Sequence, residues 1–222
     1  MKRPQNGGIS EEIIHGINSR GCLMWNLDIA WKDEKSIYET AIETKALKRK
    51  IDNEQLHYFK ARELNEVCPI PKQNEQYRII TEKQFNSFAL VLSLLETRDI
   101  DELYLAIYRV NEPTVATLTE FIDQGRIKYA AFVLSSFFNA TKKPEVWTRR
   151  LSEYCKENPQ KTDHVYAHIH AKVMAARSGD DYFVFEGSGN MSDNARIEQY
   201  VYENNKQVFD FHKEWILKVI EQ

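Results

Sequence analysis

From Tyr77 onward the chain alternates short apolar runs with segments of helical spacing, and this alternation restricts the fold more than any other feature. The run RIKYAAFVL (126–134) is nearly all apolar, as expected of a strand whose two faces are both covered. Ahead of it, EPTVATLTEFIDQG (112–125) begins with a helix-compatible proline and stops at a glycine. Repeated β-α-β units predict an α/β fold, in which a mixed β-sheet is flanked by helices on both faces.

A segment with two prolines, CPIPKQNEQ (68–76), separates this region from the first third of the chain. Before it, the residues from about Glu34 to Glu66 are mostly good helix formers with an irregular apolar stripe, so we expect helix there. The break in pattern predicts a mainly helical N-terminal extension over residues 1–72 and an α/β domain over residues 73–222.

Charge and cysteine content narrow the class of protein. The formal net charge of −3 over 222 residues argues against an entirely basic surface but leaves room for a local basic groove. The basic clusters KALKRK (45–50), TKK (141–143) and Arg149-Arg150 are most simply solvated helix faces. Three cysteines without C-x-x-C spacing fit reduced thiols.

No apolar run approaches the length of a membrane span, and the N-terminus lacks the apolar region of a secretory signal. We therefore expect a soluble cytoplasmic protein that does not contact membranes.

The stretch HVYAHIHAKVM (164–174) places three histidines within seven residues. If it is one strand, His168, His170 and Lys172 share a face because side chains alternate with period two. Polar side chains in a row on one face of a central strand cost stability unless they meet partners. The row therefore predicts a functional site, with His168 the weaker candidate and His164, near the strand entrance, outside it.

Two chemistries fit this row. Imidazoles two residues apart can share a metal ion, although Lys172 would place a positive charge beside the cation. Alternatively, a lysine and a histidine grip a phosphate, and the neutral imidazole attacks phosphorus. The turn GSGN (187–190) then adds Ser188 and Asn190 as hydrogen-bond donors, with glycines that let the backbone approach the ligand. In that case a second imidazole must protonate the leaving group.

His170-Ala171-Lys172, followed after an apolar strand by Gly187-Ser188-Gly189-Asn190, resembles the H-x-K … G-S-x-N signature of the phospholipase D superfamily. Glu198 at the start of the next strand, and an amphipathic helix with a tryptophan after it, are similar to the ending of that family. The resemblance covers about residues 164–217. One position departs from it: the family often has an aspartate five residues after the lysine, where this chain has Arg177. We expect that position at the far end of the strand from the histidine.

The resemblance implies a phospholipase D-like domain that uses no metal or other cofactor. It makes His170 the nucleophile that forms a phosphohistidine, with phosphate oxygens held by Lys172 and Asn190. Ser188 would support them, and Glu198 would orient an imidazole and favour its charged form. The family needs two motifs per active site and this chain has one, so the resemblance implies a homodimer with a shared active site.

We therefore expect a metal-independent phosphodiesterase, with nucleic acid as the substrate because small single-motif members of the family often act as nucleases. KALKRK could supply phosphate contacts. Two alternatives stay open. One is a phospholipase D-like module that binds nucleic acid with weak or no turnover. The other is a metal hydrolase that uses His164, His168 and His170.

Overall fold

The computed structural model describes part of the chain, and its N-terminal unit, Met1–Ala41, lies outside that part. The described residues are 44–50 and 53–59 as backbone, and 64, 68–82, 85–140, 145–192 and 197–222.

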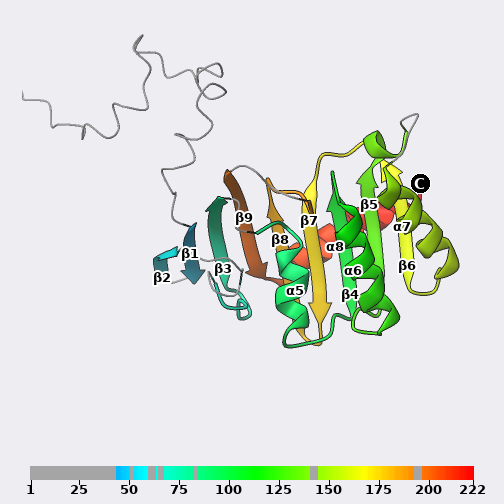
Figure 1. The fold of residues 1–222 in the computed structure, drawn as a ribbon. Helices are drawn as coiled ribbons and strands as arrows, with labels where there is room; N and C mark the ends of the chain where they lie inside the picture. The colour runs from blue at the N-terminus through cyan, green and yellow to red at the C-terminus, as the bar shows by residue number, and fades with distance from the viewer. Residues whose placement is uncertain are drawn as a thin grey trace, which may run out of the picture. The chain divides into compact units, whose positions relative to one another are not determined.

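Nine described strands form one mixed sheet in the order β2-β1-β3-β9-β8-β7-β4-β5-β6 (Figure 1). Their bounds are β1 Thr44–Lys50, β2 Asn53–Phe59, β3 Gln76–Glu82, β4 Glu102–Ile107, β5 Ala130–Ser135, β6 Thr162–Ala167, β7 Lys172–Ser178, β8 Asp181–Gly187 and β9 Ile197–Asn204. Strands β4, β5 and β6 are parallel, and every other neighbouring pair in this sheet is antiparallel.

Helices cover both faces of the sheet (Figure 1). One face carries α5 (Ala89–Leu95), α6 (Glu112–Asp123) and α7 (Val146–Glu157), and the other carries α8 (Lys206–Ile220). The short 3-10 helix η1 (Ser136–Phe138) follows β5 directly. The expected α/β class, with a mixed sheet between two helical layers, is confirmed.

Local sequence explains where two of these helices begin. The side chain of Asn111 accepts a hydrogen bond from the Thr114 amide and so caps α6, whose first turn contains the expected proline. Asn205 caps α8 in the same way, and Phe209 on that helix is fully buried against the sheet. Burial of one such ring stabilises the fold by about 2 kcal/mol. Strand β5 is buried along its whole length, as its apolar sequence predicts.

The helix expected from Glu34 to Glu66 is wrong for the two segments that the structure describes as β1 and β2. They pair antiparallel as a hairpin with Lys50 opposite Asn53, and β1 also pairs with β3. Helix propensity is a weak preference, and the hydrogen bonds that β1 gains along the edge of an existing sheet outweigh it. The sheet thus begins inside the expected extension of residues 1–72. That residues 73–222 form a separate catalytic domain stays a prediction.

The expectation of a single strand through the histidines is also wrong. Strand β6 ends at Ala167, residues 168–171 form a connection, and β7 begins at Lys172. Strands β5 and β4 lie between β6 and β7 in the sheet, so the connection passes the carboxyl ends of both. The period-two argument therefore does not apply to His168 and His170, because neither belongs to a strand.

Two of the three cysteines lie in the described part, and both Cys68 and Cys155 are free and buried. Burial raises the pKa of their thiols to about 12 and about 11, respectively, so both stay protonated at neutral pH. Cys22 lies outside the described residues.

Among the described helices, none combines the length and the apolar character that crossing a bilayer requires.

Candidate active site

The predicted site residues come from the ends of several strands at one edge of the sheet. Lys172, the first residue of β7, pairs with Ile107 at the carboxyl end of β4. Gly187 ends β8 opposite Tyr200 in β9, close to the start of that strand. Ligands of open α/β sheets bind outside the carboxyl ends of parallel strands, and this edge includes those ends of β4, β5 and β6.

His170 and Lys172 are in direct contact. The Lys172 ammonium lies 3.2 Å from Nδ1 and 3.4 Å from Nε2 of the imidazole, and it donates to the His170 carbonyl oxygen at 2.9 Å. The imidazole itself is exposed, whereas Lys172 is buried. A solvent-facing ring beside a buried cation suits attack on an anionic substrate, since the cation draws the anion in and the ring remains accessible.

Burial lowers the pKa of Lys172, because an ammonium loses hydration inside the protein. The nearby Glu198 carboxylate opposes part of that change in pKa through its negative charge. The Lys172 Nζ atom also lies 5.2 Å from the centroid of the Tyr108 ring, and that ring is 4.5 Å from the imidazole of His170. Tyr108 thus contacts both members of the pair.

Ser188 and Glu198 form a second pair across β8 and β9. The serine hydroxyl donates a hydrogen bond to the Glu198 carboxylate and accepts one from the Gln199 amide at 3.0 Å. The Ser188 amide donates in turn to the Gln199 carbonyl at 3.0 Å. Two residues of β9 therefore hold this hydroxyl in place at the edge of the sheet.

Gly187 is required by strand packing. A Cβ atom at this position would lie 2.1 Å from the Gln199 carbonyl oxygen and 2.6 Å from Cδ1 of Tyr200. The space that a side chain at Gly187 would need is filled by β9, whereas Gly187 itself lines the cavity. That the glycines of this turn let the backbone approach a ligand stays a prediction. The missing side chain allows the close approach of the two strands that positions Ser188.

Asn190 is held by the chain that leaves β4. Its Oδ1 atom accepts a hydrogen bond from the Arg109 amide at 3.2 Å, and its carbonyl oxygen accepts one from the Ser87 amide at 3.2 Å. The Ser87 hydroxyl donates to the carbonyl of Gly189. The segment before α5 and the segment after β4 thus both support the GSGN turn.

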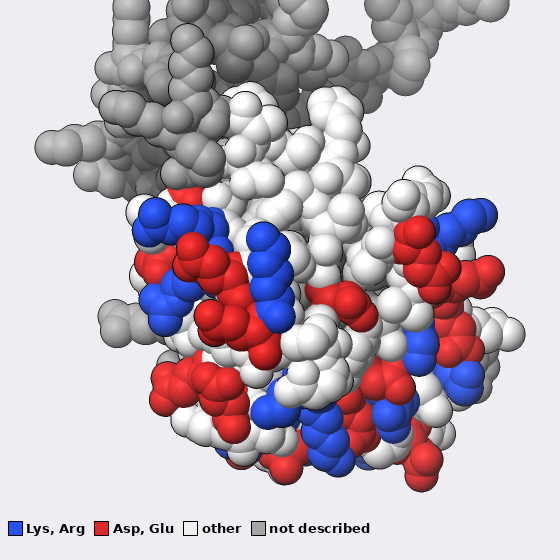
Figure 2. Space-filling model, turned by 90° about the vertical axis from the view of Figure 1, so that its right-hand side faces the viewer, with Lys and Arg blue, Asp and Glu red and all other residues white. Residues whose placement is uncertain are grey.

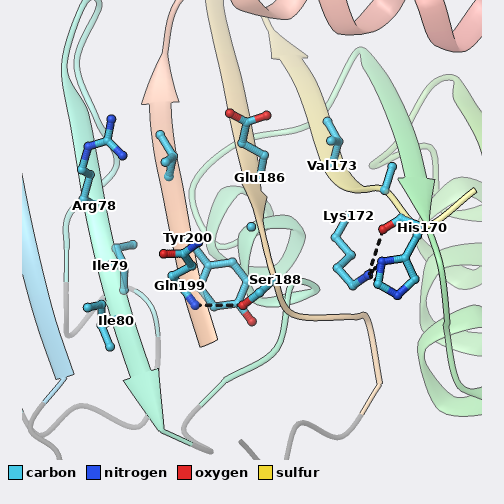
Figure 3. Close-up of a pocket in the computed structure, with 13 residues that line it drawn as sticks. Arg78, Ile79, Ile80, His170, Lys172, Val173, Glu186, Ser188, Gln199 and Tyr200 are labelled. Carbon is cyan, nitrogen blue, oxygen red and sulfur yellow. Dashed lines mark hydrogen bonds between the residues drawn. The ribbon is translucent and has the colours of Figure 1, made fainter. Parts of the chain in front are cut away.

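A cavity of about 650 Å³ contains part of this arrangement. His170, Lys172 and Ser188 line it, together with Arg78 and Glu186 (Figure 3). Figure 3 shows the His170–Lys172 pair and the Ser188 hydroxyl on either side of the lower part of this cavity, with Arg78 on β3 farther from the pair. Of the five predicted residues, Glu198 and Asn190 are not among those that line the cavity. Glu198 accepts a hydrogen bond from Ser188, and Asn190 accepts one from the Arg109 amide.

Arg177 lies at the other end of β7, where it pairs with Glu102. Its guanidinium group contacts Asp101 at 3.1 Å and Glu102 at 3.0 Å. Arg177 therefore lies at the end of the strand away from His170, as expected, and it forms ion pairs there.

The three histidines considered as metal ligands do not form a cluster. His164 Nε2 lies 3.1 Å from the Ser152 hydroxyl on α7, and burial lowers its pKa. His168 is exposed in the connection after β6. Within the part of the chain that the structure describes, no three His, Cys, Asp or Glu side chains are grouped as metal ligands. The geometry does not fit the metal-hydrolase alternative.

Among the three basic clusters, side chains are described for Arg149-Arg150. Arg150 pairs with Glu112 at 2.8 Å and Arg149 with Glu153 at 3.8 Å, as expected for a solvated helix face. The backbone of KALKRK lies in β1, and TKK is outside the described residues.

Sequence reasoning missed Tyr108, Arg109 and Ser87, which contact the predicted residues. The only available signal was position, because Tyr108 and Arg109 follow the carboxyl end of an apolar strand, where functional side chains gather. Ser87 acts through its backbone and hydroxyl contacts with the GSGN turn, and a local pattern cannot indicate such a distant partner.

No protein-family model matches the chain, and no curated protein sequence matches it. Solved structures do match it in fold. TrmBL2, an archaeal chromatin protein described as showing a novel mode of DNA binding, has 16% identity over 65% of this chain and 52% of its own, with a TM-score of 0.46. A polyphosphate kinase from Porphyromonas gingivalis has 18% identity over 66% of this chain and 26% of its own, with a TM-score of 0.47.

A phosphatidylserine synthase from Haemophilus influenzae has 13% identity over 77% of this chain and 42% of its own, with a TM-score of 0.43. The chain spans 26% to 52% of the length of these three proteins. The three likenesses concern the fold, and all three TM-scores lie below 0.5, so the function proposed below depends on the site itself.

Proposed function

We propose that this chain is a metal-independent phosphodiesterase that acts on nucleic acid through a phosphohistidine intermediate, with an active site shared across a homodimer. The observation that carries the proposal is the contact between the exposed imidazole of His170 and the buried ammonium of Lys172, 3.2 Å apart in the cavity that Ser188 also lines. This pair joins a nucleophile to a cation that attracts a phosphodiester.

In the first step a ring nitrogen of His170 attacks phosphorus. A nitrogen–phosphorus bond forms, and the bond between phosphorus and the leaving oxygen breaks. Lys172 holds a non-bridging oxygen, with the side-chain amide of Asn190 as a further hydrogen-bond donor, so the negative charge that develops on these oxygens is stabilised. Ser188, whose hydroxyl donates to Glu198, supports this arrangement. The leaving oxygen takes up a proton and departs as an alcohol.

A second imidazole must supply that proton, because His170 uses its nitrogen in the attack. The other histidines whose side chains the structure describes do not fit the role. His164 contacts Ser152 beside α7, and His168 is exposed in the connection. His212 on α8 is buried and lies 3.3 Å from the Glu186 carboxylate. A two-fold axis beside this edge would bring His170 of the partner subunit to the site. Glu198 would then orient an imidazole and favour its charged form.

In the second step a water molecule attacks phosphorus, and the second imidazole accepts its proton. The nitrogen–phosphorus bond breaks, which regenerates His170 and releases a phosphomonoester. The two steps together convert one phosphodiester and one water into one phosphomonoester and one alcohol, so no oxidant or metal is needed for the balance.

The proposal can be tested with the purified full chain, bis(p-nitrophenyl) phosphate and oligonucleotides, in the presence of EDTA. His170→Ala should abolish hydrolysis, whereas His168→Ala, which removes an exposed imidazole two residues away, should retain it. A stalled reaction should leave an acid-labile, base-stable phosphoryl group on His170. Hydrolysis that needs a divalent metal, or that survives His170→Ala, would exclude this mechanism. Oligonucleotide binding without any turnover would favour the alternative of a binding module.

Subunit exchange tests the shared site separately. When wild-type chain is mixed with excess His170→Ala chain and allowed to exchange, activity should fall with the square of the wild-type fraction, because only dimers with two intact imidazoles complete the cycle. A linear fall would show that each subunit works alone.

A further inference from the structure

An aromatic platform lies beside the proposed nucleophile, formed by the rings of Tyr108 and Phe137. Phe137 lies in η1, directly after the carboxyl end of β5, and it is 61% exposed. The two rings are stacked, with centroids 6.4 Å apart and planes inclined by 29°. The Tyr108 ring is in turn 4.5 Å from the imidazole of His170. An exposed ring face is thus continuous with the active site.

Buried neighbours fix this platform. Phe138 packs edge-on against Tyr108 at 5.2 Å and against Phe137 at 5.1 Å. Phe138 also contacts the fully buried Trp147 at 6.0 Å between ring centroids. The Phe137 ring is therefore held by a rigid core below it, and ordering it for a ligand costs little conformational entropy.

Cations lie next to the rings. The Arg109 guanidinium is 5.4 Å from the Phe138 centroid, and the Lys172 ammonium is 5.2 Å from the Tyr108 centroid. Figure 2, which looks toward the side of the molecule with α7 and β6, shows Lys and Arg mixed with Asp and Glu over the lower part and a largely uncharged upper part, toward this edge of the sheet. Arg109 pairs with Glu145 at 3.2 Å, so Lys172 is the cation beside the rings that matches a ligand with a flat apolar face and an anionic backbone.

Single exposed apolar side chains are common and by themselves indicate nothing. Phe211 illustrates this, because it is 63% exposed on α8 and its ring packs edge-on against His212. Phe137 differs because it stacks on a ring that touches His170. The combination of stacking, rigidity and proximity to the nucleophile distinguishes it.

We propose that the Tyr108–Phe137 platform stacks the base of the nucleotide next to the scissile phosphate, and that the substrate is accordingly a single-stranded nucleic acid. This inference rests on the proposed function and names the substrate class for the same site. A base in a duplex is already stacked between its neighbours, so only an unpaired base can lie on the Phe137 ring without a cost for unstacking.

The test measures binding in a His170→Ala background, so that the oligonucleotide stays intact. Phe137→Leu keeps apolar bulk and removes the ring, and Phe211→Leu is the matched control. We expect Phe137→Leu to raise the Kd for a single-stranded oligonucleotide about tenfold, within the range reported for base–aromatic stacking. Phe211→Leu should leave Kd unchanged. With an oligonucleotide that has an abasic site at the stacked position, the two variants should bind equally.

A single 2-aminopurine placed at successive positions locates the stacked base. Its fluorescence should be quenched at one position and recover in Phe137→Leu. The Kd of a duplex of the same sequence should not respond to Phe137→Leu. Equal binding by Phe137→Leu and Phe211→Leu, equal sensitivity of single strand and duplex, or failure of the unsubstituted chain to bind any oligonucleotide would each overturn the proposal.

A subunit contact at Phe137 is the competing explanation, and analytical ultracentrifugation of Phe137→Leu addresses it. A loss of dimer would assign Phe137 to an interface and overturn the platform. The proposed function has its own readout, because hydrolysis of bis(p-nitrophenyl) phosphate depends on His170. That hydrolysis can fail while Phe137-dependent binding persists, or persist while Phe137 has no effect on oligonucleotide binding.

Discussion

The Ser188 hydroxyl donates a hydrogen bond to the Glu198 carboxylate, so a residue at the end of β8 is tied to one at the start of β9. Ser188→Ala removes this hydrogen bond, so the Glu198 carboxylate near Lys172 loses the donor that holds it. We expect kcat/KM to fall about tenfold, which corresponds to ~1.4 kcal/mol and lies near the value of a hydrogen bond to a charged group.

The matched control for this change is Ser178→Ala at the opposite end of β7, where the hydroxyl donates to the Asp99 carbonyl at 2.7 Å. Steady-state kinetics and thermal unfolding of both variants check the prediction. Equal losses of activity in the two variants would show that the Ser188–Glu198 bond has no special part in the site.

Gly187→Ala should lower both the free energy of unfolding and the activity. The new methyl group would lie 2.1 Å from the Gln199 carbonyl oxygen, so β8 and β9 must separate to admit it. We expect a loss of about 2–3 kcal/mol in the free energy of unfolding, the upper part of the range for overpacking, with a parallel fall in kcat/KM. Urea denaturation measures the first quantity.

Gly125→Ala provides the comparison for that glycine. Its φ of +74° strains any other residue, but no atom lies within 4 Å of the added Cβ. Gly125→Ala should lower the free energy of unfolding by about 1 kcal/mol and leave kcat/KM unchanged. If Gly187→Ala were no worse than Gly125→Ala, strand packing would not be the reason for the glycine.

The lowered pKa of Lys172 predicts the position of the alkaline limb in the pH profile. Burial favours the neutral amine, so the ammonium that holds the phosphate is lost at a pH below the ordinary value of 10.5. The descending limb of kcat/KM should therefore have its midpoint below 10.5. Lys172→Arg should lower activity at neutral pH and remove this limb, since guanidinium remains charged throughout. A limb that is unchanged in Lys172→Arg would assign it to another group.

Placing aspartate at position 177 should weaken the fold without affecting the chemistry. Arg177→Asp would remove the contacts with Asp101 and Glu102 and add a third carboxylate beside them. We expect the free energy of unfolding to fall by about 2 kcal/mol at neutral pH.

Acidification should reduce the difference in the free energy of unfolding between the unsubstituted chain and Arg177→Asp. Lys128, the Gly179 amide and Arg177 lower the pKa of Asp101, so its contribution to stability is present above the ordinary value of 3.8 and is lost as the pH falls through the lowered value. Denaturation at several pH values, with Arg177→Gln for comparison, measures the effect. A drop in kcat/KM of the folded Arg177→Asp protein would contradict the remoteness of this position from His170.

Part of this molecule could be predicted from local pattern alone. The apolar sequence of Ala130–Ser135 indicated a strand covered on both faces, and the proline and glycine around α6 indicated its limits. The spacing of Lys172 and Arg177 placed the arginine at the far end of β7. These features depend on residues close together in the chain, where periodicity and turn chemistry are direct consequences of side-chain type.

Tertiary structure decided the rest, because strand pairing depends on partners far away in the sequence. The preference for helix in Thr44–Phe59 was overridden when β1 paired with β3. His168 and His170 lie in a connection and not in a strand, because β5 and β4 occupy the positions between β6 and β7. The contact between Tyr108 and His170 exists only because residues 168–171 cross the carboxyl end of β4, and no local pattern records that crossing.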